Sequence, residues 1–359
     1  MIRRLAFVLG LCAILSGTFS APGHAALGAG SFTKHHYGAS GDPFGRDYWL
    51  YEPLHISVPR VLVVYLHGCT QTAPDAANGT RWNELADKRG FVVVYPEQDA
   101  GNGPQDATVR SLEGSANGAR CWNWFRPEDQ SRGSGEPATI AGITKAVMAH
   151  DKIDARRVYV LGASAGADMS TVMAATYPDI YAAVGSVVGC PYVTCSDVSG
   201  ELAYRAMAQR ARSMPAFVVD GEADELNPFV NSQTVVEEWL GVADLADDGK
   251  LNGSVSRKPS SVDNYGIDQS AIGGIGQPTD TCIRNMEFPC LGGFLGFKKS
   301  YPYTVFTYSD AGRSLVSFWL IHGLGHDYPG GDPSGSFTDP LGPDITTGAY
   351  NFFVAHPRR

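Results

Sequence analysis

The chain has 359 residues and a formal net charge of −9 at neutral pH. Hydrophobic residues make up 43% of the chain and charged residues 18%, a balance typical of a globular protein that buries a sizeable core. The acidic charge and the lack of a basic stripe in the sequence exclude nucleic acid and anionic membrane surfaces as expected partners. They do not identify a substrate or an oligomeric state.

The first 25 residues have the order of a secretory signal peptide. Arg3 and Arg4 precede an apolar run over 5–15, and small residues follow up to Ala25. The run is too short to span a bilayer. We therefore expect cleavage near residue 25, a secreted or periplasmic protein without membrane contact afterwards, and one folded domain over 26–359. A retained N-terminal anchor is the alternative.

The cysteines indicate disulfide bonds. Removal of Cys12 with the signal peptide leaves six of the seven cysteines, an even number that is typical of bridges in an exported chain. Other pairings stay open, but the spacing favours three pairs: Cys190 with Cys195, Cys282 with Cys290, and the remaining Cys69 with Cys121. No spacing typical of a zinc site is present, so we expect neither a metal nor a cofactor.

From about residue 45, strand-like and helix-like stretches alternate along the chain. Short Val-rich runs that are apolar at successive positions predict strands buried on both faces: 61–66, 91–96, 157–162, 182–188 and 215–220. Helices are expected near 80–88, 137–150, 165–177, 200–212 and 231–240. Two later strands, 303–310 and 314–323, are joined by a turn.

This alternation predicts an α/β fold with a doubly wound, mostly parallel sheet. The stretch 243–300 interrupts it, because it is rich in Gly, Ser, Asp and Asn. We expect an irregular insertion there, pinned by the bridge between Cys282 and Cys290, that could cover a site as a lid.

The segment "GASAG" at 162–166 is the first candidate for chemistry. Ser164 lies between a buried strand and a predicted helix, and its small neighbours allow the sharp turn that presents a nucleophile. An ordinary turn serine is the alternative. A serine hydroxyl is a weak nucleophile near neutral pH, so it needs a base, an acid that orients the base, and hydrogen-bond donors for the oxyanion.

The candidate base is a histidine that follows Ser164 in the sequence, as the order Ser, acid, His requires. His326 lies in a Gly-rich loop just beyond a predicted strand, where a side chain can reach back to the serine. His322 ends that strand and is the alternative, with a structural role. His356 lies near the end of the chain, where fraying is usual.

The candidate acid follows the predicted strand at 215–220. Asp224 lies further into the loop than Asp220, so its side chain is better placed to reach a histidine, and Asp220 is the alternative. Oxyanion donors are expected from the loop "HGCTQT" at 67–72, through the backbone N–H of Cys69 or Thr70, and from Ala165.

Four segments together resemble a known esterase family. They are "LHGCTQ" at 66–71, "CWNWF" at 121–125, "GLGH" at 323–326 and "GSFTDPLGPDITTGAYNFF" at 335–353. They are similar to the extracellular polyhydroxybutyrate (PHB) depolymerases and, more distantly, to feruloyl and acetylxylan esterases. The resemblance implies an α/β-hydrolase fold and a triad of Ser164, Asp224 and His326.

The resemblance also implies a substrate class. We expect hydrolysis of short-chain polyhydroxyalkanoates such as poly(3-hydroxybutyrate), or of its oligomers, through an acyl-enzyme. His67, Trp122 and Trp124 are candidate substrate-binding residues, although tryptophans beside a cysteine are as often part of the core. The family usually has Ala-Trp after the histidine, whereas Asp327 and Tyr328 stand here, so the substrate does not carry over directly.

Two other functions are weighed against this one. The first is a carbohydrate esterase that releases feruloyl or acetyl groups. The second is a non-catalytic binding protein on a hydrolase fold, which the complete set of Ser, Asp and His argues against. Because the sequence ends just past the predicted catalytic region, we expect no separate polymer-binding domain and therefore soluble oligomers or amorphous polyester as substrates.

Overall fold

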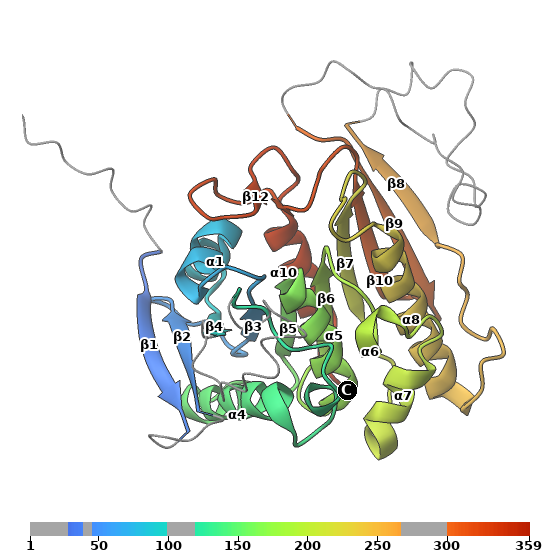
Figure 1. Cartoon of the computed structure of the whole chain (residues 1–359), viewed down its shortest axis with the longest axis horizontal. Helices are drawn as coiled ribbons and strands as arrows, with labels where there is room; N and C mark the ends of the chain where they lie inside the picture. Colours follow the sequence, from blue (N-terminus) through green and yellow to red (C-terminus); the bar gives the residue numbers. More distant parts are fainter. Residues whose placement is uncertain (1–27, 39–44, 99–118, 267–299) are drawn as a thin grey trace, which may run out of the picture.

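The computed structural model describes residues 28–38, 45–98, 119–266 and 300–359. The predicted signal peptide, Cys282 and Cys290 lie outside these residues. Within them, one sheet has ten strands in the order β1-β2-β4-β3-β5-β6-β7-β10-β9-β8 (Figure 1). No helix among the described residues is long and apolar enough to cross a membrane.

The middle of the sheet is parallel. It consists of β4 (Val92–Pro96), β3 (Leu62–Leu66), β5 (Val158–Ala163), β6 (Ala183–Val187), β7 (Ala216–Gly221) and β10 (Arg313–Ile321). The first five of these are buried at every residue, which confirms the strands predicted from Val-rich runs.

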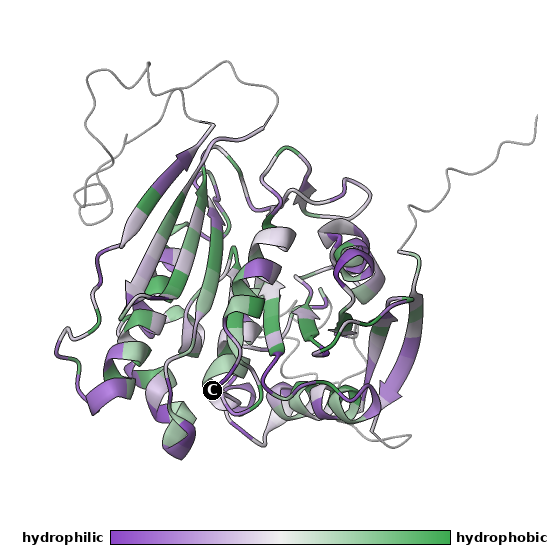
Figure 2. Ribbon diagram, turned by 180° about the vertical axis from the view of Figure 1, so that it is seen from behind, coloured by the Kyte–Doolittle hydropathy of each residue, from purple (hydrophilic) through white to green (hydrophobic). Residues whose placement is uncertain are grey.

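The edges of the sheet are antiparallel. They consist of β1 (Ser31–Tyr37) and β2 (Arg46–Glu52) at one end, and β9 (Tyr303–Asp310) and β8 (Ser261–Tyr265) at the other. The predicted hairpin of β9 and β10 is confirmed. Strand β1 was not predicted because most of its side chains are exposed and its residues are largely hydrophilic, which the purple of its ribbon in Figure 2 shows.

Helices cover both faces of the sheet (Figure 1), so the fold is the predicted doubly wound one. One face carries α4 (Gly135–His150), α5 (Ala165–Thr176), α7 (Glu201–Met207) and α8 (Val230–Asp248). The other carries α1 (Ala73–Thr80), α2 (Trp82–Arg89) and α10 (Ile345–Ala355). Alternate residues of β3 therefore enter two different hydrophobic clusters.

The short elements lie in the connections between these layers. They are the 3₁₀ turns η1 (Pro127–Asp129) and η2 (Ala208–Arg210), the helix α6 (Tyr192–Cys195), and the two-residue strands β11 (Tyr328–Pro329) and β12 (Thr338–Asp339). Strands β11 and β12 pair with each other outside the main sheet.

Two predicted boundaries are corrected. The helix expected at 80–88 is α2, which begins at Trp82 because Arg81 before it has a left-handed backbone with φ 60°, and the preceding helix α1 was not predicted. The irregular stretch expected from residue 243 begins later, because buried Leu245 keeps α8 helical up to Asp248. Part of that stretch is also the edge strand β8.

Candidate active site

Ser164 occupies a strained turn between β5 and α5, with φ 54° and ψ −126°. Two glycines make the turn possible. A β carbon at Gly166 would lie 2.0 Å from the carbonyl oxygen of Leu66, and one at Gly162 would lie 2.4 Å from the backbone of Gly166. The predicted sharp turn is therefore present, and close backbone approach explains both glycines of the motif.

His326 and Asp224 form a hydrogen-bonded pair. Asp224 follows β7, and its Oδ2 lies 2.7 Å from Nδ1 of His326. The other carboxylate oxygen accepts the backbone N–H of Leu226 at 2.9 Å and of Asn227 at 2.8 Å. These donors orient the carboxylate, which in turn holds the Nδ1 proton and leaves Nε2 of the ring as an acceptor.

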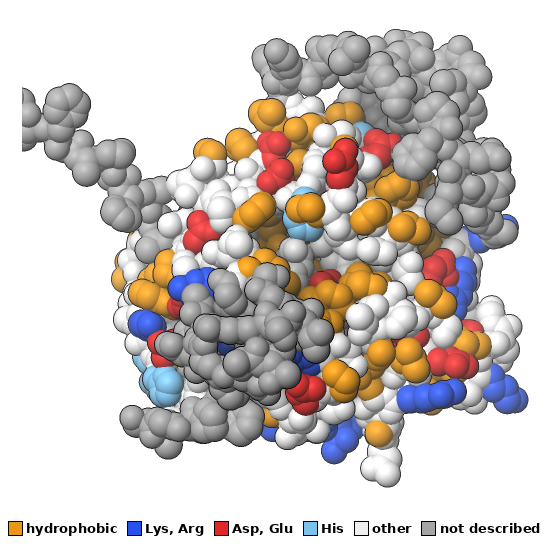
Figure 3. Space-filling model, in the orientation of Figure 1, with side chains coloured by type: hydrophobic (Ala, Val, Ile, Leu, Met, Phe, Trp, Pro, Cys, Tyr) orange, Lys and Arg blue, Asp and Glu red, His pale blue; other side chains and the backbone are white. Residues whose placement is uncertain are grey.

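Ser164 and His326 line one cavity of about 430 Å³. The part of the chain that the structure describes supplies no hydrogen-bond partner for the Ser164 hydroxyl or for Nε2 of His326. Such catalytic hydrogen bonds are often long before a substrate binds. Trp124, Leu226 and Phe337 also line the cavity, and hydrophobic side chains gather around a hollow on the face that Figure 3 shows.

The alternative residues are placed elsewhere. Both ring nitrogens of His322 are engaged, by Glu222 at 3.2 Å and by Thr304 at 2.9 Å. Asp220 is fully buried, its Oδ1 accepts its neighbour's backbone N–H at 2.7 Å, and burial raises the pKa of its carboxyl well above the usual range. His356 contacts two backbone carbonyl oxygens. None of these three lines the cavity.

In the loop after β3, one of the predicted oxyanion donors already has an acceptor within the protein. The backbone N–H of Thr70 donates to the carbonyl oxygen of Ala119, so Thr70 is not a free oxyanion donor, which corrects that expectation. The N–H groups of Cys69 and Ala165 have no acceptor within the described residues. That of Ala165 is at the N-terminal end of α5, where the helix dipole favours negative charge.

Two of the three predicted disulfides are confirmed. Cys69 is bonded to Cys121, which ties the loop after β3 to the segment at 119–121. Cys190 is bonded to Cys195, and both residues line the cavity. The third pair lies outside the described residues.

His67 and Trp122 lie behind the cavity wall, which corrects the prediction that they bind substrate. Their side chains are 1% and 0% exposed. His67 donates from Nδ1 to the Gly68 carbonyl at 2.8 Å and accepts the N–H of Gln98 at Nε2, and burial lowers its pKa to about 4. Trp122 donates to the carbonyl of His67. Of the three predicted substrate-binding residues, Trp124 alone lines the cavity.

A polar wall of the cavity was missed in the sequence. Asp168 on α5 lines it together with Asn227 and Asn231. Asp168 is 8% exposed, its Oδ1 accepts the N–H of Cys190 at 2.7 Å, and burial raises the pKa of its carboxyl to about 8. The sequence did contain one indication of this wall, because Asp168 follows Ser164 by one helical turn and therefore lies on the same side of the helix.

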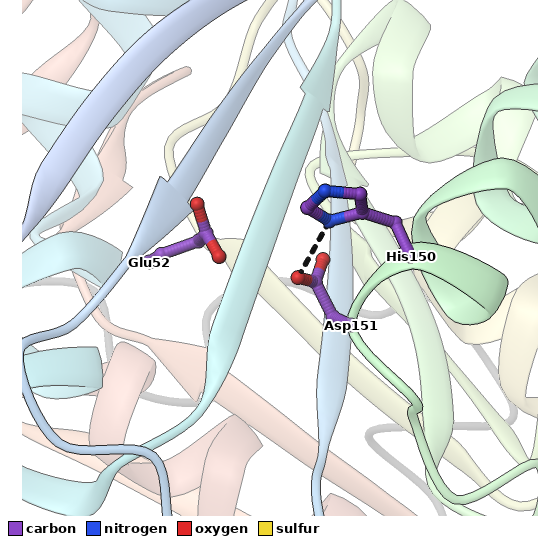
Figure 4. A group of neighbouring side chains, drawn as sticks. All are labelled: Glu52, His150 and Asp151. Carbon is purple, nitrogen blue, oxygen red and sulfur yellow. Dashed lines mark hydrogen bonds and ion pairs between the residues drawn. The ribbon is translucent and has the colours of Figure 1, made fainter.

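One group of side chains has the composition of a metal site, away from the cavity. Ligand atoms of Glu52, His150 and Asp151 lie within 4.8 Å of one another (Figure 4). His150 hydrogen-bonds Asp151 at 2.9 Å, whereas burial and then the nearby negative charge of Asp151 raise the pKa of the Glu52 carboxyl. Oδ2 of Asp151 is buried without a hydrogen-bond partner among the described residues, and His150 is exposed.

The chain is similar to several esterases in sequence. A family model described as "Esterase PHB depolymerase" matches residues 46–269. Poly(3-hydroxyalkanoate) depolymerase C of Paucimonas lemoignei is 34% identical over 269 residues, which are 75% of this chain and 55% of the relative. Probable acetylxylan esterase A of Aspergillus clavatus is 30% identical over 218 residues, which are 54% of this chain and 65% of the relative.

A solved structure shows the same fold. The acetyl xylan esterase from Aspergillus awamori has a TM-score of 0.59 and 17% sequence identity, and the match covers 90% of this chain and 99% of that one. This likeness concerns the fold alone. In sequence, the chain spans between about half and two thirds of the length of the two relatives named above.

Proposed function

Because this chain belongs to the esterase family of the PHB depolymerases, we propose that it is a serine esterase. The observation that carries the proposal is the hydrogen bond between His326 and Asp224 at a cavity that Ser164 also lines. A ring nitrogen held by a buried carboxylate, a second ring nitrogen without a partner, and a serine on a strained turn are the parts that acyl transfer requires.

In the proposed mechanism, the Ser164 hydroxyl attacks the ester carbonyl carbon while Nε2 of His326 takes its proton. Asp224 stabilises the imidazolium that forms. The N–H groups of Cys69 and Ala165 donate to the oxyanion, and the first of them is held by the bridge to Cys121. The histidine then protonates the leaving alcohol, and water activated by the same ring releases the acyl group.

The proposed substrates are short-chain polyhydroxyalkanoates such as poly(3-hydroxybutyrate), or their oligomers. Support comes from the 34% identity to a poly(3-hydroxyalkanoate) depolymerase and from apolar side chains at the cavity, where Leu226 is 75% exposed and Phe337 49%. Removal of acetyl groups from xylan is the second candidate, because the acetylxylan esterase relative is 30% identical.

We further propose that the chain carries one catalytic domain after an N-terminal signal peptide and acts in an oxidising compartment. The two disulfides support that compartment, because such bonds persist outside the reducing cytosol.

The experiment is an acid-release assay on the purified protein with 3-hydroxybutyrate trimer, amorphous poly(3-hydroxybutyrate) and acetylated xylan side by side. We expect release from the trimer and amorphous polymer, and a loss of about 10⁴-fold or more in Ser164→Ala. A fluorophosphonate should label the native protein and not that variant. Release from xylan alone would favour the second candidate, whereas neither turnover nor labelling would leave a non-catalytic binding protein.

A further inference from the structure

Asp168 is held on the cavity wall close to the nucleophile. It lies one turn of α5 after Ser164, and its backbone N–H donates to the carbonyl oxygen of Ser164 at 3.0 Å. Its side chain is 8% exposed, and Oδ1 accepts the N–H of Cys190 at 2.7 Å. The carboxyl group therefore has a defined position relative to the reacting hydroxyl.

The second oxygen of this carboxyl, Oδ2, has no hydrogen-bond donor among the described residues. Asp168 nevertheless lines the cavity. In Asp224, by contrast, both oxygens have partners. Oδ2 is not among the fully buried atoms that lack a partner, so a ligand group in the cavity that pairs with it takes the place of solvent and not of another residue.

The neighbouring polar groups do not compete for this oxygen. The Asn227 amide donates to the carbonyl of Gly189 at 3.0 Å, and Asn231 donates to Asn227 at 2.7 Å. No lysine or arginine is among the described residues that line the cavity, so nothing there favours an anionic substrate group. The free oxygen is matched by a neutral group that both donates and accepts, and in an ester substrate that group is a hydroxyl.

We propose that Asp168 forms a hydroxyl-binding subsite that selects esters whose acyl group carries a free hydroxyl near the ester carbonyl, the class of 3-hydroxyacyl esters. This inference rests on the proposed serine esterase function and specifies its acyl group. It assigns Asp168 to substrate selection, and the acid of the triad remains Asp224.

The choice of a hydroxyl over other polar groups follows from what each can donate. Burial raises the pKa of Asp168 to about 8, so protonated and ionised carboxyl groups are both present near neutral pH. A hydroxyl donates and accepts, and it pairs with either form. The carbonyl of an internal ester unit only accepts, so it pairs with the protonated form alone.

The subsite has a consequence for oligomers. A poly(3-hydroxyalkanoate) chain has a free 3-hydroxyl at one end only. An acyl group selected for that hydroxyl is the terminal unit, so hydrolysis releases one 3-hydroxy acid from the hydroxyl end. The acyl C–O bond breaks, the hydroxyl of water is added to the acyl carbon, and the proton passes to the alcohol of the next unit.

The test compares p-nitrophenyl esters of 3-hydroxybutyrate, 3-methoxybutyrate and butyrate. The measured quantity is the ratio of kcat/KM for the hydroxy ester to that for each of the others, because a general change in Ser164 geometry cancels in a ratio. In the wild-type protein we expect the ratio against butyrate to be about tenfold or more, the size of a lost hydrogen bond to a buried carboxyl. The ratio against the methoxy ester should rise to a similar size as the pH is raised above 8, because the ionised carboxyl no longer donates to an ether oxygen. In Asp168→Ala both should fall to about one.

Asp168→Asn retains the shape of the side chain, an acceptor for Cys190 and the ability to bond a hydroxyl, so its ratios should lie between those of wild type and Asp168→Ala. Asn231→Ala removes a polar group from the same wall and should leave the ratios as in wild type. Ratios near one in wild type, or ratios that Asp168→Ala does not lower, would overturn the subsite while leaving the esterase intact. No hydrolysis of any ester by wild type would overturn the proposed function and the subsite with it.

Discussion

Two histidine–carboxylate pairs lie side by side at the ends of β7 and β10. His326 contacts Asp224 at 2.7 Å, and His322, four residues earlier, contacts Glu222 at 3.2 Å. The rings differ in their other nitrogen. In His322 it meets Thr304 at 2.9 Å, whereas in His326 it has no partner among the described residues, and that ring lines the cavity. A carboxylate partner alone therefore does not mark a base, and a free nitrogen beside a nucleophile does.

The strongest test of this difference exchanges each ring for alanine. His326→Ala removes the proposed proton acceptor, and kcat/KM for a p-nitrophenyl ester should fall by about 10⁴-fold or more. His322→Ala removes two hydrogen bonds that hold the edge of the sheet, and we expect a loss of about 1–3 kcal/mol in unfolding free energy with kcat/KM within about tenfold. Similar losses of activity in the two variants would refute the assignment.

The carboxylates of the two pairs, Asp224 and Glu222, should also differ in their effect on activity, by a smaller factor. Asp224→Asn keeps the shape of the side chain but cannot hold the Nδ1 proton in the same way, so kcat should fall by about 10³-fold to 10⁴-fold. Glu222→Gln should change kcat by less than about threefold, since this pair does not reach the cavity. Steady-state kinetics on one p-nitrophenyl ester measure both, and equal effects would contradict the comparison.

A third histidine, His67, differs from these two pairs in its effect on the pH dependence of the unfolding free energy. The ring of His67 is buried without a carboxylate partner, and burial lowers its pKa from 6.5 to about 4. Between these pH values the unfolded state binds a proton that the folded state does not, so stability falls as the pH falls. The resulting loss of unfolding free energy amounts to about 3 kcal/mol at or below pH 4.

The measurement is urea unfolding of wild type and His67→Asn from pH 7 to pH 4. Buried acids such as Asp168, whose pKa is raised, change stability in the opposite direction, but they are common to both proteins and cancel in the difference. The wild type should lose stability relative to the variant as the pH is lowered. A difference that does not vary with pH would show that His67 titrates alike in both states.

Most of the parallel sheet could be predicted because its strands bury both faces and are therefore apolar at successive positions. The relation of Asp224 to His326 was also predictable, because both residues follow strands that end at the same edge of a parallel sheet. The edge strand β1 gave no comparable pattern, since its pairing with β2 compensates for exposed polar side chains.

The details of the site that were missed depend on residues distant in the sequence. The N–H of Thr70 donates to the carbonyl oxygen of Ala119, and Nε2 of His67 accepts the backbone N–H of Gln98. Neither partner can be read from the motif "HGCTQT". Asp168 was missed for another reason: an acid inside a helix suggests a solvated face, and only the fold turns this one towards a cavity.

The glycines around Ser164 set a limit on how this protein can be redesigned. Any side chain at Gly162 or Gly166 would displace backbone, so libraries that vary these positions should yield inactive or unfolded clones. Leu226 and Phe337 line the same cavity and are exposed, so variation there costs little core packing. A search for variants with an altered substrate range should therefore begin at the rim of the cavity, because substitutions there leave the turn that holds Ser164 unchanged.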